Sequence, residues 1–240
     1  SGTFNMYGGR ISGNVSKDTS DGGGGGVYVC NSSTFNMSGN AAVSGNTAQY
    51  GSGVYLSSNS TFTMSEHAAI SGNSAAMTGG GVFVSSGSIT MSSDAVISGN
   101  NAGNNGGGIY ISYPGTFTME NGTISGNSAD KNGGGVYVHN SGAFTMNSGS
   151  ITGNSATEGG GGVRLDKGTF NMSGSAVISR NTADGYGGGV DVNNGSFTMS
   201  GGSITGNTTT GDNANFCGGG GVDVYNGGSF TMSGGSITGN

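Results

Sequence analysis

The chain has 240 residues, of which 56 are glycine and one is proline, and only 8% are charged. Strong helix formers are scarce beside Gly, Ser, Thr and Asn, which excludes an ordinary helical or α/β core. The net charge is −6 and no basic residues cluster, so nucleic acid is not an expected partner. No apolar stretch has the length that a membrane span requires, so none is expected in these residues.

Three short motifs recur along the chain with a period of about 27 residues. They are Phe-x-Met, Ser/Thr-Gly-Asn, and a Val or Ile that follows glycine. The first residue of Phe-x-Met is Phe4, Phe35, Phe62, Ile89, Phe117, Phe144, Phe170, Phe197 and Phe230 in successive repeats. The Asn of the second motif is Asn14, Asn46, Asn73, Asn100, Asn127, Asn154, Asn181, Asn207 and Asn240. The residue after the glycines is Val27, Val54, Val82, Ile109, Val136, Val163, Val190 and Val222. Because three independent motifs agree over nearly the whole chain, the sequence predicts a repeat architecture.

The unit is clearest in residues 133–154, where apolar side chains alternate within 136–138, 144–146 and 150–152. Glycine and asparagine separate these segments, as tight corners require, and no gap is long enough for a helix. The pattern predicts an all-β fold, a right-handed parallel β-helix of about nine coils of about 27 residues, each with three short strands. We interpret residues 1–240 as a single β-helix domain and as a segment of a longer repeat protein.

Equivalent residues of successive coils are expected to stack as columns. The Phe and Met columns should form the core, and we interpret the Met column as core filling rather than as a metal site. The Asn column should form a ladder in which each side-chain amide bonds the next. The loop between the Asn and the Val expands at 15–26 and 208–221, and solenoids often place interacting surfaces on such insertions.

The two cysteines, Cys30 and Cys217, lie about seven coils apart. At about 4.8 Å per coil this separation is more than about 30 Å, which excludes a disulfide between them. Each is expected to be a free thiol or to bond another molecule, and two cysteines do not fix the redox compartment.

An aromatic column occupies the outward position between the two apolar residues of the strand that follows the glycines. Five rings at about 4.8 Å spacing predict a flat, exposed ladder. Such a ladder either binds sugars or another protein, or only stabilises the sheet. The five candidate binding residues are Tyr28, Tyr55, Phe83, Tyr110 and Tyr137.

Charged residues follow the rings along the same face, with His139 and Arg164 beside the carboxylates Asp166, Asp191 and Asp223. Stacked Asp191 and Asp223 are expected to repel each other and to share a proton or a cation. These three carboxylates are the catalytic candidates, although surface acids usually only solvate a face. A calcium ion there is an open alternative, but the prediction is that no metal and no cofactor is bound.

A second outward face carries hydroxyl pairs on either side of the inward Phe, for example Thr61 with Thr63 and Thr116 with Thr118. A regular Thr-x-Thr grid on a flat sheet is similar to the surface of ice-binding β-helices. Plain β-propensity explains the same threonines, and Asn5, Asn36 and Ala143 interrupt the grid.

The segment GGGVYV, together with GTFTM and GTISGN, resembles the right-handed β-helix repeats of bacterial surface proteins. It is similar to polymorphic outer-membrane autotransporter passengers, whose coil is shared with the pectate-lyase-like superfamily, and the likeness covers essentially residues 1–240. The resemblance implies an extracellular or cell-surface location in a bacterium and a structural or adhesive role. The expected partners are surface glycans, host proteins or the chain itself, through head-to-tail or lateral association. A polysaccharide-binding or polysaccharide-cleaving protein is the alternative, and an ice-binding surface is the second; we predict no enzymatic activity.

Overall fold

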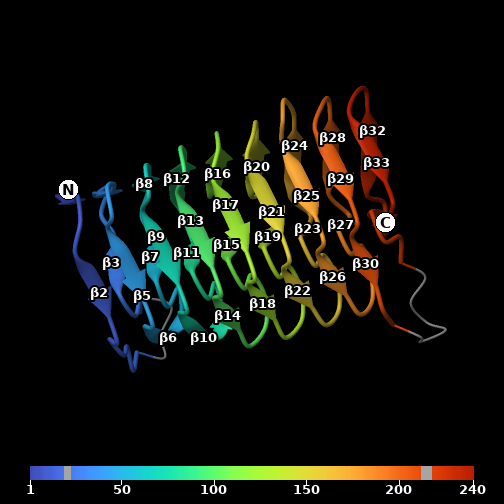
Figure 1. Ribbon diagram of the computed structural model, residues 1–240. Coiled ribbons are helices and arrows are strands. Elements are labelled where there is room, and N and C mark those ends of the chain that lie inside the picture. The colour runs from blue at the N-terminus through green and yellow to red at the C-terminus, as the bar shows by residue number, and fades with distance from the viewer. Residues whose placement is uncertain (19–22, 212–217) are drawn as a thin grey trace.

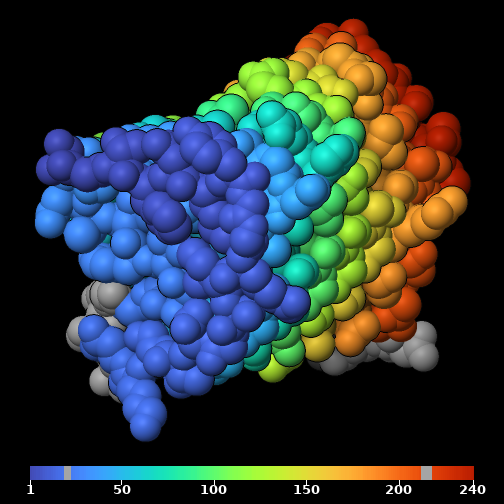
Figure 2. Space-filling view, turned by 60° about the vertical axis from the view of Figure 1, so that its left-hand side comes forward, coloured from blue at the N-terminus to red at the C-terminus, as the bar shows by residue number. Residues whose placement is uncertain are grey.

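The computed structural model describes residues 1–18, 23–211 and 218–240. Within them all regular elements are β-strands, and the strands pair in parallel into four sheets. The turns stack along one axis from the N-terminal to the C-terminal end (Figure 1), and the space-filling view shows them as successive bands in chain order (Figure 2). The predicted all-β parallel β-helix is confirmed.

Sheet A contains the Phe-x-Met segments and has nine strands. Residues of one strand pair with their equivalents one turn away, so that Phe pairs with Phe and Met with Met. The strands are β1 (Thr3–Met6), β4 (Thr34–Met37), β8 (Ser60–Met64), β12 (Gly87–Met91), β16 (Thr116–Met119), β20 (Ala143–Met146), β24 (Thr169–Met172), β28 (Ser196–Met199) and β32 (Ser229–Met232).

Sheet B follows in each turn and also has nine strands, each with one central aliphatic residue directed into the core. The strands are β2 (Arg10–Ser12), β5 (Ala42–Ser44), β9 (Ala69–Ser71), β13 (Val96–Ser98), β17 (Thr123–Ser125), β21 (Ser150–Thr152), β25 (Val177–Ser179), β29 (Ser203–Thr205) and β33 (Ser236–Thr238).

Sheet C was not expected, and it makes four strands in a turn where the sequence predicted three. It lies directly after the Asn column and has seven strands. Most are only two residues long, and the inward residue is usually a buried Ala, which is why no alternation of apolar residues revealed them. The strands are β6 (Thr47–Tyr50), β10 (Ser74–Thr78), β14 (Asn101–Ala102), β18 (Ser128–Ala129), β22 (Ser155–Ala156), β26 (Thr182–Ala183) and β30 (Thr208–Thr209).

Sheet D contains the strands that follow the glycines and has eight of them. The complete turns number about eight, slightly fewer than the nine coils expected. The strands are β3 (Val27–Val29), β7 (Val54–Leu56), β11 (Val82–Val84), β15 (Ile109–Ile111), β19 (Val136–His139), β23 (Val163–Asp166), β27 (Val190–Asn193) and β31 (Val222–Tyr225).

The core is a stack of like side chains. The rings of Phe144 and Phe170 stack with nearly parallel planes and with centroids 4.6 Å apart, and Ile89 interrupts the column once. The Met column lies beside it and is buried through most of the solenoid. Burial of the same apolar groups in every turn supplies the main driving force for folding, while neighbouring turns provide the backbone hydrogen bonds that one coil lacks.

The Asn column forms the predicted amide ladder at the corner between sheets B and C. Asn154 illustrates it: its Nδ2 donates to Oδ1 of Asn181 at 2.9 Å and to the carbonyl of Ile124 at 3.0 Å. Its Oδ1 accepts from the backbone N and from Nδ2 of Asn127, both at 2.9 Å. The preceding Gly153 has a φ of 63°, a left-handed conformation that glycine adopts without strain and that turns the chain sharply before the Asn.

Candidate functional site

The five predicted aromatic residues lie on successive strands of sheet D and stack on one another. The ring centroids of Phe83 and Tyr110 are 4.9 Å apart, and those of Tyr110 and Tyr137 are 5.2 Å apart. Tyr55 stacks on Phe83 at 4.8 Å, whereas Tyr28 is tilted against Tyr55. Because each inner ring packs its faces against its neighbours, those faces are not open to a planar ligand.

The expectation that the whole ladder is exposed is wrong for Tyr55 and Tyr137, which are only 2% and 6% exposed, although Tyr28 is 46% exposed. The loop from sheet C to sheet D covers them. Gly133 in this loop has a φ of 66°, and a Cβ there would lie 2.7 Å from Cβ of Tyr137. The close approach of glycine backbone to the outer face of sheet D is what buries the rings.

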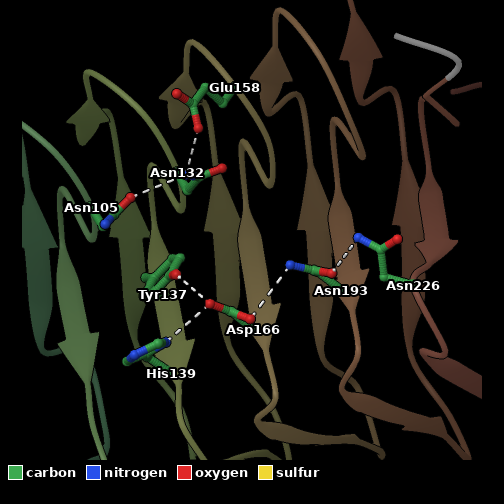
Figure 3. A network of polar contacts seen from close by, with 8 residues as sticks. All are labelled: Asn105, Asn132, Tyr137, His139, Glu158, Asp166, Asn193 and Asn226. Carbon is green, nitrogen blue, oxygen red and sulfur yellow. Dashed lines mark hydrogen bonds and ion pairs between the residues drawn. The ribbon is translucent and has the colours of Figure 1, made fainter. Parts of the chain in front are cut away.

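Asp166 is the centre of a hydrogen-bond network that spans four turns (Figure 3). Its Oδ2 accepts from the Tyr137 hydroxyl and contacts Nδ1 of His139, both at 3.2 Å. Its Oδ1 accepts from Nδ2 of Asn193 at 3.4 Å, and Asn226 donates to Asn193 at 3.0 Å. Burial and the nearby Asp166 charge raise the pKa of the Tyr137 hydroxyl, which keeps it a donor. Both oxygens of Asp166 are therefore engaged by neighbouring turns.

Asp191 is fully buried and pairs with Arg164 of the preceding turn, through its Oδ2 and the Nη1 of the arginine. Asp223 stands beside Asp191 in the register of sheet D, as the sequence indicated. Asp191 thus forms an ion pair with the Arg164 guanidinium, and the Asp223 carboxylate lies on its other side, as the spacing suggested. Gly159 covers the pair so closely that a Cβ there would overlap both Asp191 and Arg164. Asp191 consequently lies beneath the loop and is closed to a polymeric substrate.

Burial raises the pKa of the Asp191 carboxyl to about 7, although the charge of Arg164 lowers it. An unfolded Asp titrates near pH 3.9. The folded protein therefore binds this proton more tightly between about pH 4 and pH 7, so the contribution of Asp191 to folding stability falls as the pH rises through this window. We expect Asp191→Asn to remove this term, which amounts to at most about 1.4 kcal/mol per pH unit.

The measurement is urea unfolding of both proteins between pH 4 and pH 8. The stability of the wild type relative to Asp191→Asn should decrease as the pH rises. Asp94→Asn is the control, because the Asp94 side chain is 75% exposed. A difference that is constant across the range, or that grows in favour of the wild type, would contradict the prediction.

A column of loop residues just before the glycines forms the wall opposite sheet D. Isolated parallel bridges connect Asn105 with Asn132, Asn132 with Gly159, and Gly159 with Tyr186. Asn132 donates through Nδ2 to Oδ1 of Asn105 at 3.2 Å and to Oε2 of Glu158 at 2.9 Å (Figure 3). Glycine thus replaces a side chain at one position of the column, and the pair of buried charges fills the space.

A pocket of about 350 Å³ lies beside this pair and is lined by Asn132, Glu158, Arg164, Tyr186 and Tyr225. The rings of Tyr186 and Tyr225 stack with centroids 4.8 Å apart, and Cζ of Arg164 lies 5.5 Å from the centre of the Tyr225 ring. Burial raises the pKa of the Tyr225 hydroxyl to about 12. The sequence reasoning missed Asn132, Glu158 and Tyr186. The sequence does carry a signal for this pocket, because the residue type changes from Asn to Gly to Tyr at one repeat position just before the glycines.

The hydroxyl pairs predicted on sheet A lie on its outer face in register across all nine strands, and all are exposed or half-exposed. Asn36 donates to Asn5 at 2.8 Å within the same columns.

Cys30 is a half-buried free thiol, whereas Cys217 lies outside the described residues, so the expectation about its state stays a prediction.

No group of three or more His, Cys, Asp or Glu suited to a metal ion occurs in residues 1–18, 23–211 and 218–240. In the same ranges no helix is long and apolar enough to cross a membrane.

The sequence of residues 67–237 matches a protein family described as a right-handed β-helix region. No curated protein and no solved structure matches the chain. Since the family match covers well over half of the chain, the chain belongs to the right-handed β-helix family.

Proposed function

We propose that the chain is a structural and adhesive segment of an extracellular bacterial surface protein, and that its adhesive surface is the outer face of sheet A. The observation that supports this proposal is the in-register repetition of short hydroxyl and amide side chains on every strand of that sheet. Its resemblance to bacterial surface repeats supports the location. Surface glycans and host proteins are the proposed partners, together with lateral or head-to-tail contact with further copies.

The physical basis of adhesion is multivalency on a rigid support. Each turn presents nearly the same polar pair, so a repetitive partner such as a glycan chain or a fibrous protein contacts several turns at once. Weak contacts at a fixed spacing then combine into a much higher overall affinity. The stacked Phe rings and the buried amide ladder hold the spacing constant, because closely packed interiors deform little.

The test places three lysines on sheet A, with the triple substitution Thr63→Lys, Thr118→Lys and Thr198→Lys. The matched control places lysines on sheet B in the same three turns, with Ser71→Lys, Ser125→Lys and Thr205→Lys. All six positions are half-exposed, so both variants are expected to fold.

Binding is measured by surface plasmon resonance on immobilised mucin, extracellular matrix and cell-wall glycans. We expect the sheet A variant to lose at least about tenfold in apparent affinity and the sheet B variant to change little. Equal losses in the two variants would remove sheet A as the adhesive surface. Turnover of a polysaccharide by the wild type would contradict the structural role in favour of an enzyme, and inhibition of ice growth would contradict it in favour of an ice-binding surface.

A further inference from the structure

The pocket beside the Arg164–Asp191 pair contains two buried polar atoms that are not satisfied by the protein. Among the described residues, the buried side-chain atoms without a hydrogen-bond partner are Oδ1 of Asn132, Nε of Arg164, Oδ1 of Asp191 and Oε1 of Gln49. Asn132 and Arg164 line the pocket, and they are only 9% and 8% exposed. In Figure 3 the Oδ1 end of Asn132 points away from Asn105, while its Nδ2 is occupied by Asn105 and Glu158. Buried polar atoms without partners are rare because each costs free energy.

A ligand that satisfies both atoms must donate a hydrogen bond to Asn132 and accept one from Arg164. A hydroxyl does both, and neighbouring hydroxyls on one ring do so at two places together. The exposed carboxylate of Glu158 offers an acceptor for a further hydrogen bond from a hydroxyl group at the rim. The site therefore offers a mixed set of donors and acceptors, as recognition of several hydroxyl groups requires.

The charge of the pocket disfavours an anionic ligand. The single cation, Arg164, is already paired with Asp191, and Glu158 adds a negative charge at the rim. A carboxylate or phosphate would meet this negative charge without a free cation in compensation. A cationic ligand is disfavoured as well, because the guanidinium of Arg164 already lies over the Tyr225 ring, 5.5 Å from its centre.

The size and the apolar part of the pocket restrict the ligand further. A volume of about 350 Å³ is near the lower end of the range for small-molecule sites, roughly 300–1,000 Å³. The stacked rings of Tyr186 and Tyr225 supply an amphipathic wall with apolar carbon beside hydroxyl groups. We infer that this pocket binds a single uncharged sugar residue, with Asn132, Glu158 and Arg164 bonding its hydroxyl groups and the two tyrosines contacting its C–H surface. This inference does not depend on adhesion through sheet A.

The experiment is saturation-transfer NMR on the full chain, with glucose, galactose, mannose and N-acetylglucosamine as probes and with glucosamine and galacturonate as charged comparators. We expect at least one neutral sugar to bind with a dissociation constant on the order of millimolar, because so small a ligand has few contacts. Saturation should be transferred from the aromatic protons of Tyr186 and Tyr225. Preference for a charged comparator, or transfer from none of these protons, would overturn the inference.

Glu158→Ala and Tyr186→Ala are each expected to weaken binding by at least about tenfold. Glu120→Ala is the matched control, since Glu120 accepts a hydrogen bond from Asn147 at 3.0 Å just as Glu158 accepts one from Asn132, but at another corner of the solenoid. Circular dichroism and the unfolding midpoint check that all three variants remain folded. Undiminished binding in both pocket variants would overturn the inference. The sheet A lysine variant should keep its affinity for the sugar. Failure of adhesion through sheet A and failure of sugar binding in the pocket are therefore distinguished.

Discussion

Replacement of Phe144 with alanine is expected to lower the free energy of unfolding by about 3–5 kcal/mol. The side chain is fully buried, and its ring stacks on Phe117 at 4.8 Å and on Phe170 at 4.6 Å. Alanine would remove both stacking contacts and leave a cavity that the rigid turns on either side close only in part. Urea unfolding followed by circular dichroism measures the loss.

The control for this prediction is Phe4→Ala in the same column. Phe4 is 45% exposed and stacks on a single described neighbour, Phe35, at 5.0 Å. Its replacement is expected to cost roughly 1 kcal/mol, since only part of its area is removed from water. If the two substitutions destabilised the protein equally, the stacked Phe column would not be the main source of core stability.

The architecture was predictable because every turn repeats the same pattern of residues. A strand such as β20 pairs with its equivalents one turn away, so the same inward Phe and Met must recur and the period becomes visible in the sequence. The amide ladder was predictable for the same reason, because each Asn needs an equivalent Asn above and below it. Sheet C escaped prediction because a strand like β18, Ser128–Ala129, is too short to show alternation and its inward side chain is small.

The candidate site was predictable only in part, because it depends on contacts between different positions of the repeat. The register along sheet D correctly placed Arg164 next to Asp191. Their burial depends on the backbone of Gly159, in a loop whose path over the sheet does not follow from strand periodicity. The same loop brings Glu158 to the pocket, and the equivalent loop of the next turn brings Tyr186. A repeat position at which the residue type changes from turn to turn therefore indicates such a pocket better than the type of any single residue does.

Substitution of Asn154 with aspartate is expected to be strongly destabilising although the two side chains are nearly isosteric. Asn154 is 1% exposed, and its Nδ2 is replaced by an oxygen that faces two acceptors, Oδ1 of Asn181 at 2.9 Å and the carbonyl of Ile124 at 3.0 Å. At neutral pH the new carboxylate is buried without a cation, and two attractive contacts become repulsive. We expect a loss of about 4 kcal/mol in the free energy of unfolding at pH 8.

The loss is also expected to depend on pH in a definite direction. Burial and the neighbouring acceptors favour the neutral acid, so the pKa of the introduced Asp lies above its unfolded value of about 3.9. A protonated carboxyl restores one donor to the ladder, and the variant should therefore regain stability as the pH falls from 8 to 5. Urea unfolding at the two pH values measures this recovery, with Asn171→Asp on the exposed face of sheet A as the control. If the Asn154 variant were no less stable than this control at pH 8, or gained nothing at pH 5, the amide ladder would not contribute to stability through its directed hydrogen bonds.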